Sequence, residues 1–277
     1  MLEVRTAFRK LISQRNFKGL ELRKVSLPLL SRVPGGLLSY RSQNSDTSNW
    51  SKFSNNNIVT VHCIRHAEST INALRNHHLE TLNIQKLIYR KDPGILDAPL
   101  SRNGAEKASH FGDKGGPLYL GKPIMERSSL ILTSNLKRAM ETANIISKRS
   151  PKDCKICVLD FVREKALYES DIPSSSVEEI LSNYPRADVT FLSHANFKEA
   201  IVLPESLDQL DLRIQQFLNF IRNYEGFENN EVVLVSHFYF LKRLLKGSVL
   251  WNLPNLGVIT IQIDKRTGQI LGSSTHR

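Results

Sequence analysis

From residue 58 onward, short apolar runs alternate with longer stretches in which apolar and polar residues recur at helical spacing. The run IVTVHCI at 58–64 is β-branched and apolar almost throughout, which is typical of a strand buried on both faces of a parallel sheet. We predict three further strands, at 130–133, 156–161 and 231–235. The stretch 207–224 has the pattern of an amphipathic helix.

Helical patterns fill the intervals between these strands. We predict four further helices. The first covers 69–89, the second begins at about Ser101, and the third runs from a cap at Ser134 through Ile146. The fourth follows His237 and carries Leu241, Leu244 and Leu245 on one face. The runs 257–263 and 269–271 flank a polar turn and predict a terminal hairpin. Strands that alternate with helices indicate an α/β domain, in which a mostly parallel sheet has helices on both faces. We predict that this single domain spans residues 58–277.

Residues 1–57 have a different character. They hold 10 Lys and Arg against 3 Asp and Glu, which is +7 of the net charge of +11. The first twenty residues are basic, amphipathic and poor in acidic side chains, and so resemble a mitochondrial transit peptide, with a candidate processing region at 39–42. Serine and asparagine dominate 42–57, which indicates a linker. We expect a mitochondrial protein; a disordered basic tail on a cytoplasmic protein is the alternative.

Composition excludes several classes of protein. Residues 58–277 carry 28 Lys and Arg against 24 Asp and Glu, without a nucleic-acid-binding motif, so we expect no nucleic-acid partner. No apolar run approaches the ~18 residues that a membrane-spanning helix needs. Three cysteines do not form a disulfide framework and fit a reducing compartment. The sequence predicts nothing about oligomeric state.

Polar side chains follow four of the predicted strands, at the edge where open α/β sheets bind ligands. Arg65 and His66 end the first strand, Arg138 lies one turn into the helix after the second, Glu164 follows the third, and His237 follows the fourth. Taken singly, each has an ordinary alternative as a solvated surface or strand-end residue. Together they supply a nucleophile, two cations, a second imidazole and an acid, which suffice for phosphoryl transfer without a metal.

Four motifs resemble the histidine phosphatase superfamily, also called phosphoglycerate mutase-like. They are IRHAESTIN at 64–72, TSNLKRAMETA at 133–143, VREKALYESDIP at 162–173 and LVSHFYFL at 234–241. The resemblance covers essentially all of residues 58–277. It implies a three-layer α/β/α sandwich with a mainly parallel sheet, and a phosphomonoesterase that works through a phosphohistidine without metal or cofactor.

The resemblance also implies roles for individual residues. His66 would be the nucleophile that becomes phosphorylated, and Glu164 the proton donor. The phosphoryl oxygens would be held by Arg65, Arg138 and His237, with a further hydrogen bond from Asn72. The motif around Glu164 is the loosest of the four. Asp171 in the same loop is a competing acid, and Glu169 is a weaker one.

The chain departs from the family at one motif position, where Ala67 replaces the usual glycine. We expect activity to survive if the turn avoids left-handed backbone angles. The stretch from Asn72 to 98–104 does not look like the glycine- and tryptophan-containing loop of the cofactor-dependent mutases, which favours a phosphatase. Mutase-type transfer and a non-catalytic phosphate-binding scaffold remain alternatives. Residues 73–97 and 168–198 are expected to wall the pocket; the sequence does not identify the phosphorylated small molecule or phosphoprotein that binds there.

One competing pattern suggests zinc. His66-Ala67-Glu68 together with Cys154 and Cys157 is faintly similar to the ligands of zinc deaminases. In those enzymes a proline directly precedes the first cysteine, whereas here Pro151 stands three residues before it. Both cysteines also border a predicted strand, where small apolar residues are expected. We therefore expect no metal site.

Overall fold

The computed structural model describes residues 57–80, 94–192, 201, 203–246 and 253–276. The predicted extension and linker, except for Asn57, lie outside the described residues. The same holds for residues 81–89 of the predicted first helix and for parts of both predicted pocket walls. Within the described ranges, no helix is long and apolar enough to cross a membrane.

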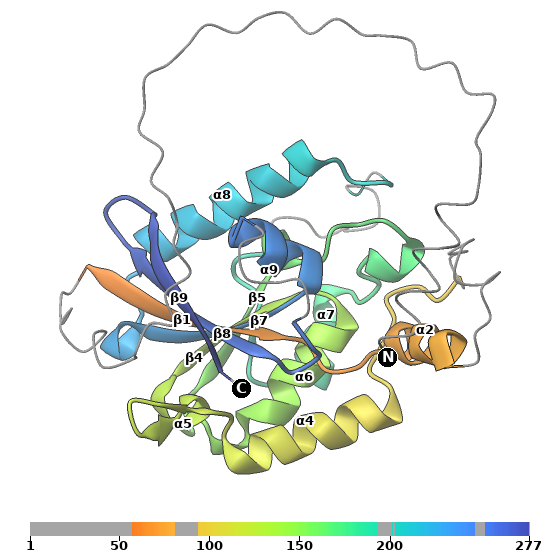
Figure 1. Ribbon diagram of the computed structural model, residues 1–277, viewed down its shortest axis with the longest axis horizontal. Helices are drawn as coiled ribbons and strands as arrows, with labels where there is room; N and C mark the ends of the chain where they lie inside the picture. The colour runs from red at the N-terminus through yellow and green to blue at the C-terminus, as the bar shows by residue number, and fades with distance from the viewer. Residues whose placement is uncertain (1–56, 81–93, 193–200, 202, 247–252, 277) are drawn as a thin grey trace, which may run out of the picture. The chain divides into compact units, whose positions relative to one another are not determined.

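A seven-stranded sheet forms the centre of the domain (Figure 1). Its strands are β1 (Ile58–Arg65), β4 (Leu130–Ser134), β5 (Lys155–Leu159), β6 (Ala187–Asp188), β7 (Glu231–Ser236), β8 (Val258–Asp264) and β9 (Ile270–His276). They follow the order β6-β5-β4-β7-β1-β8-β9. Neighbouring strands from β6 to β1 pair in parallel, and β8 and β9 complete one edge as the predicted antiparallel hairpin. The sheet is therefore mainly parallel, as predicted.

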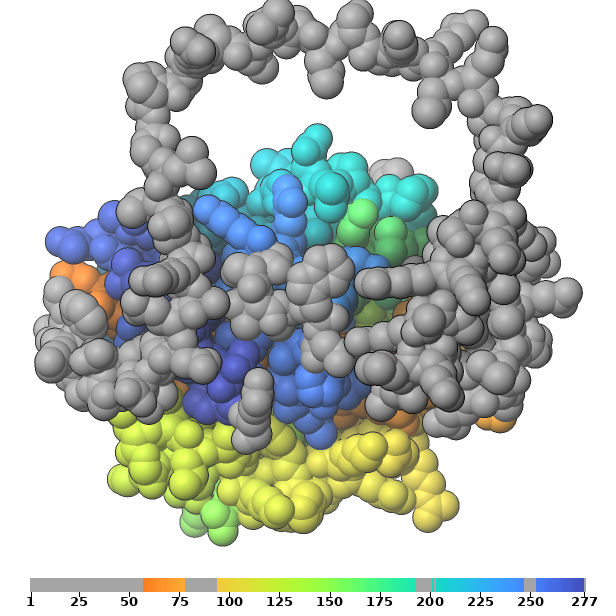
Figure 2. All heavy atoms as spheres, in the orientation of Figure 1, coloured from red at the N-terminus to blue at the C-terminus, as the bar shows by residue number. Residues whose placement is uncertain are grey.

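Helices cover both faces of this sheet, which confirms the predicted sandwich. The helices are α2 (Thr70–Glu80), α4 (Arg102–Lys114), α5 (Ile124–Arg127), α6 (Lys137–Ile146), α7 (Val177–Asn183), α8 (Leu207–Asn223) and α9 (Phe238–Leu244). Figure 1 places α8 and α9 on one side of the sheet and α4, α5 and α6 on the other. In the space-filling view, α4 (yellow) and α8 (cyan) lie at opposite sides of the described part of the domain (Figure 2).

Two hydrophobic cores follow from the alternation of side chains along the central strands. Successive residues of a strand point to opposite faces, so β1 contributes to both cores. Cys63 belongs to the core that contains Phe217 of α8, whereas Ile64 belongs to the core that contains Ala108 of α4 and Ala139 of α6. All five residues are fully buried. This burial on both faces explains why the strand sequences are almost continuously apolar.

The start of α6 differs from the prediction. Ser134 is predicted to cap this helix, but the helix begins three residues later, at Lys137, after Leu136 in the N-cap position. The N–H of Lys137 donates instead to Oδ1 of Asp97 at 2.9 Å, so a carboxylate from a distant loop satisfies the helix end. The hydroxyl of Ser134 lies 2.6 Å from Nε2 of His237 and is therefore part of the candidate site.

Other differences are small. The first strand continues through Arg65, one residue beyond the predicted end, and β5 ends at Leu159, where a 3₁₀ turn over 160–162 replaces the rest of the predicted strand. Further elements were not predicted: α5, α7, the short β6, and a two-stranded ribbon of β2 (Leu118–Tyr119) and β3 (Lys122–Pro123). These elements are too short for a clear periodic pattern.

Strand register brings the ends of the central strands to one level. Arg65 of β1 is opposite Ser236 of β7, and Ser134 of β4 is opposite Leu159 of β5. Because these strands are parallel, the residues that follow them emerge at the same edge of the sheet. The four motifs are therefore brought together by the register of four strands that are distant in sequence.

Candidate active site

His66 lies just beyond β1, in a position fixed by two hydrogen bonds. Its backbone N–H donates to the carbonyl of Ser236 at 2.9 Å, and its ring Nδ1 lies 2.7 Å from the carbonyl oxygen of Ala67. A carbonyl oxygen only accepts hydrogen bonds, so Nδ1 must carry a proton. In the neutral imidazole, Nε2 is then the nitrogen with a free lone pair.

The surroundings of His66 favour the neutral ring. Burial, followed by the positive charges of Arg138 and Arg65, lowers the pKa of His66 well below its usual value of 6.5. Only 3% of the residue is exposed to solvent. The imidazole is therefore neutral at physiological pH, and it is the form that can attack an electrophile.

The turn after His66 is held tightly from two sides. Ala67 is fully buried and is not among the residues with positive φ, so the methyl group in place of the family's glycine meets no backbone strain. Its N–H donates to Oγ1 of Thr142 on α6 at 3.0 Å. On α4, a Cβ added to Gly104 would lie 2.0 Å from the carbonyl oxygen of Glu68, so only glycine permits this contact.

His237 lies beside His66, with 4.9 Å between the two ring centroids. Its Nε2 contacts the hydroxyl of Ser134, whereas its Nδ1 is buried and has no hydrogen-bond partner within the described part of the chain. Burial is the main cause that lowers the pKa of His237 well below 6.5, and Arg138 and His66 lower it further. A buried donor without a partner is costly, so Nδ1 is available to a ligand at this site.

Arg138 projects from the first turn of α6 and is held by the loop after β5. Its Nη1 donates to the carbonyl of Ser170 at 2.7 Å, and its Nη2 donates to Oδ1 of Asp171 at 2.9 Å. The other carboxylate oxygen of Asp171 accepts the N–H groups of Leu167 and Tyr168 at 3.2 and 3.3 Å. Asp171 therefore orients the arginine and closes its own loop at the same time.

Arg65 is anchored on the other side of the site. Its Nη1 donates to the carbonyl of Leu253 at 2.7 Å, and its guanidinium carbon lies 5.4 Å from the ring centroid of Phe238. Its Nε is buried without a hydrogen-bond partner among the described residues. Like Nδ1 of His237, this N–H is a donor available to an anion.

Asn72 is linked to the site through a residue that the sequence analysis missed. The amide of Asn255 donates to the carbonyl of His66 at 2.9 Å and to Oδ1 of Asn72 at 3.3 Å. The same oxygen of Asn72 accepts the N–H of Ser69 at 3.3 Å. In these contacts the side-chain oxygen of Asn72 accepts hydrogen bonds, whereas its amide N–H groups have no partner among the described residues.

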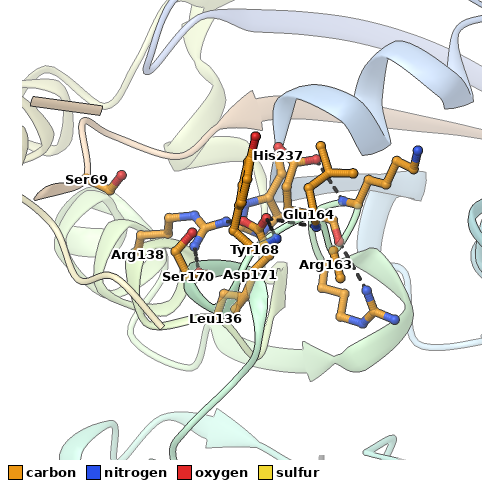
Figure 3. A network of polar contacts seen from close by, with 12 residues as sticks. Ser69, Leu136, Arg138, Arg163, Glu164, Tyr168, Ser170, Asp171 and His237 are labelled. Carbon is orange, nitrogen blue, oxygen red and sulfur yellow. Dashed lines mark hydrogen bonds and ion pairs between the residues drawn. The ribbon is translucent and has the colours of Figure 1, made fainter. Parts of the chain in front are cut away.

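Glu164 is a buried carboxyl group of the candidate site with a raised pKa. One of its oxygens, Oε1, accepts the N–H of Tyr239 at 3.0 Å and the N–H of Lys165 at 2.9 Å. Burial, followed by the negative charge of Asp171, raises the pKa of Glu164 to about 7, although Arg138 opposes this shift. The carboxyl group can thus both give and accept a proton near neutral pH. Figure 3 shows Glu164 beside His237 on one side of the cluster formed with Arg138 and Asp171.

The structure places five predicted site residues in one electrostatic cluster. Charge interactions link His66, Arg65, Arg138, His237 and Glu164 to one another, and Asn72 joins them through Asn255. Ser134, Ser170, Asp171 and Asn255 are neighbours to which the sequence analysis gave no supporting role. Ser134 and Asp171 lie inside the quoted motifs, whereas no local pattern marks Asn255.

The rival zinc pattern gains no support. In the ranges that the structure describes, no group of three or more histidine, cysteine or acidic side chains could hold a metal ion. Cys154 and Cys157 are buried, and burial raises the pKa of both thiols, that of Cys157 to about 12.

A cavity of about 660 Å³ lies beside α4, and none of the six predicted site residues lines it.

A comparison with models of protein families agrees with the motifs. The sequence model of the histidine phosphatase superfamily (branch 1) matches residues 61–271. Among curated protein sequences, no significant match was found.

Three solved structures are among those similar to this chain. Phosphoserine phosphatase of Entamoeba histolytica in complex with 3-phosphoglyceric acid shares 19% identity over 79% of this chain and 96% of its own, with a TM-score of 0.47. Phosphoglycerate mutase of Bacillus anthracis shares 18% over 79% and 92%, with a TM-score of 0.48. Mycobacterial glucosyl-3-phosphoglycerate phosphatase shares 18% over 79% and 97%, with a TM-score of 0.45. Because the sequence match covers most of the chain, this protein belongs to the histidine phosphatase superfamily, branch 1.

Proposed function

We propose that this protein is a phosphomonoesterase that works through a phosphohistidine on His66 and requires no metal. One observation carries the proposal: the hydrogen bond from Nδ1 of His66 to the carbonyl of Ala67 leaves Nε2 as a neutral nucleophile among buried cationic groups. The substrate is a phosphorylated small molecule or a phosphoprotein.

In the first step, Nε2 of His66 attacks the phosphorus atom and the bond to the ester oxygen breaks. Arg65, Arg138 and Nδ1–H of His237 stabilise the charge on the oxygens of the transferred group, and Asn72 contributes a further N–H donor. The Ser134 hydroxyl supports this role of His237 because, by donating to Nε2, it keeps the proton on Nδ1. Such preorganised donors supply most of the catalysis in phosphoryl transfer.

The departing alkoxide takes its proton from Glu164. A carboxyl group with a pKa of about 7 is partly protonated at neutral pH, so it can act as this acid. In the second step a water molecule attacks the phosphohistidine, Glu164 accepts the proton of that water, and the bond between phosphorus and Nε2 breaks. Phosphate leaves, and His66 and Glu164 return to their starting forms.

The proposal is tested with the full chain, a panel of phosphomonoesters and a chelator. We expect phosphate release that the chelator does not reduce and vanadate inhibits, with an acid-labile, base-stable phosphoenzyme. His66→Ala should abolish both the turnover and the phosphoenzyme. His110→Ala is the matched control, because this imidazole is exposed on α4 and lies outside the four motifs.

Each alternative has its own outcome in this experiment. A mutase would transfer the phosphoryl group to a second hydroxyl of the substrate instead of releasing phosphate. A phosphate-binding scaffold would bind phosphate without forming a phosphoenzyme. Normal turnover by the His66→Ala variant would contradict the mechanism itself.

A further inference from the structure

We propose that Glu205 and Arg213 are positioning residues that hold Glu164 in the geometry needed for proton transfer. The inference rests on the proposed role of Glu164 as the acid. Neither residue belongs to the four motifs. Arg213 contacts the site through the backbone carbonyl of Glu164, and Glu205 binds Arg213. Both are at least nine-tenths buried, Glu205 with 4% and Arg213 with 8% of its surface exposed.

The loop that carries Glu164 is held by side chains. After β5 the chain forms one 3₁₀ turn and then continues without helix or strand through Tyr168. Arg213, from the first half of α8, donates to the carbonyls of Phe161 at 3.0 Å, Arg163 at 2.8 Å and Glu164 at 3.3 Å. A single guanidinium thus satisfies three backbone acceptors that secondary structure leaves unpaired.

Glu205 in turn holds this guanidinium. Its two oxygens accept Nε and Nη2 of Arg213, both at 2.7 Å, in the paired arrangement that gives arginine–carboxylate contacts their directionality. Both also accept the guanidinium of Arg163 at 3.2 Å, so the two cations share one anion. Although burial opposes it, the hydrogen bond and charge of Arg213 lower the pKa of Glu205, and the carboxylate is ionised at neutral pH.

Glu205 also fixes the far side of the loop. Its Oε2 accepts the N–H of Ala166 at 3.0 Å, and its own N–H donates to the carbonyl of Ala166 at 2.7 Å. The backbone is therefore held on both sides of Glu164. Arg213 binds the carbonyls of the residues before it, and Glu205 binds Ala166 after it. Figure 3 shows the side chain of Arg163 leaving this loop on the side away from Arg138.

This arrangement explains what positions the acid. The carboxylate of Glu164 accepts two backbone N–H groups through one oxygen, and its direction depends on where its own backbone lies. A displacement of about 1 Å in a reacting group can cost ~10²-fold in rate. A purely structural network would instead affect stability and leave the proton-transfer step alone, because breaking a buried ion pair is destabilising in any protein.

The test compares Arg213→Lys with Glu205→Gln and measures kcat/KM for an alkyl phosphate and for an aryl phosphate with a good leaving group. Lysine keeps the positive charge but lacks the planar guanidinium that donates to the three carbonyls at once. Asp211→Asn is the matched control, because it removes an exposed ion pair between α8 and Arg243 of α9. Circular dichroism and thermal melts show whether each variant folds. If one of the two variants does not fold, the inference is tested with the other.

We expect both folded variants to lose about 10²-fold on the alkyl ester and only a few fold on the aryl ester. In a Glu164→Gln background, Arg213→Lys should cause no further selective loss, because the acid is already absent. Equal losses on both esters, or a further selective loss in that background, would overturn the inference while leaving the role of Glu164 intact. If Glu164→Gln alone shows no preference between the esters, Glu164 is not the acid, and the inference fails with it.

Discussion

Arg138 donates a hydrogen bond to the carboxylate of Asp171 at 2.9 Å, and both side chains are buried in the candidate site. This ion pair gives the two acidic residues of the loop after β5, Asp171 and Glu164, different environments. Asp171 accepts hydrogen bonds from an arginine and from two backbone N–H groups. Glu164 forms no ion pair with a described residue, and burial raises its pKa to about 7. A carboxyl group whose oxygens accept three hydrogen bonds is poorly placed to donate a proton, which supports Glu164 as the acid in the proposed function.

The first prediction distinguishes these two carboxyl groups. Glu164→Gln keeps the shape of the side chain and removes the acid, so turnover of alkyl phosphates should fall by ~10²–10⁴-fold. An activated aryl phosphate should slow far less in the phosphorylation step, because a stable phenolate leaves without a proton. Asp171→Asn should weaken the hold on Arg138 and slow both ester types alike. A selective loss in Asp171→Asn, with none in Glu164→Gln, would reverse the assignment.

The second prediction concerns the pH dependence of phosphoenzyme formation. Glu164 must be protonated to act as an acid, and its pKa is about 7, so the rate with an alkyl phosphate should fall as pH rises through that value. The lowered pKa of His66 keeps the nucleophile neutral on the acid side, so the rate should stay level at roughly pH 6. Rapid-quench measurements of the phosphoenzyme at several pH values test this. An aryl phosphate serves as the control and should show no loss near pH 7.

The third prediction concerns stability and needs no substrate. The pKa of Glu164 rises from 4.5 to about 7 on folding, so the wild-type protein loses stability as pH rises through this interval. Glu164→Gln cannot ionise and should be more stable than the wild type at pH 8, by up to about 3 kcal/mol, with the difference vanishing near pH 4.5. Urea denaturation at both pH values measures it. A pH-independent difference would show that Glu164 does not titrate as described.

The fourth prediction concerns Ser134, whose hydroxyl lies 2.6 Å from Nε2 of His237. Removing it in Ser134→Ala leaves the tautomer of His237 unspecified and should lower kcat by roughly tenfold, about the effect of one lost hydrogen bond. Thr133→Val is the matched control. It removes the neighbouring buried hydroxyl of β4, which makes only a 3.4 Å contact to a backbone carbonyl. If both variants lose the same activity, the effect is one of packing.

The fifth prediction concerns the N-terminal extension, which lies outside the described residues. We propose that residues 1–41 direct the protein to mitochondria, because the first twenty of them are basic, amphipathic and poor in acidic side chains. Deleting them should leave phosphatase activity unchanged and leave a fluorescently tagged protein in the cytosol. The tagged full-length chain should colocalise with a mitochondrial marker. A diffuse full-length protein would contradict the proposal.

Local sequence was sufficient for the elements that depend on local physics. Apolar runs such as 58–64 predicted buried strands because a strand covered on both faces has few positions for polar residues. The polar residues that end these runs, Arg65, His66 and His237, could be placed at the sheet edge because parallel strands deliver their ends to one side. The α/β fold and the strand-end residues of the candidate site were therefore predictable from the sequence.

The supporting contacts depended on residues that only tertiary structure brings together. Ser134 has the local pattern of a helix cap, but the register of β4 beside β7 places its hydroxyl against His237, while Asp97 caps α6 from another loop. Asn255 carries no local signal, because its role comes from its contact with the carbonyl of His66, 189 residues away.

The choice between Glu164 and Asp171 was likewise open in the sequence, since both lie in one loop. The fold distinguishes them, because it pairs Asp171 with Arg138 and buries Glu164 without an ion pair to any described residue. The sequence by itself determined the longer strands and helices and the chemical groups at the ends of the strands. The tertiary structure decided the protonation state and partner of each group, because hydrogen bonds and desolvation depend on neighbours that the order of residues does not specify.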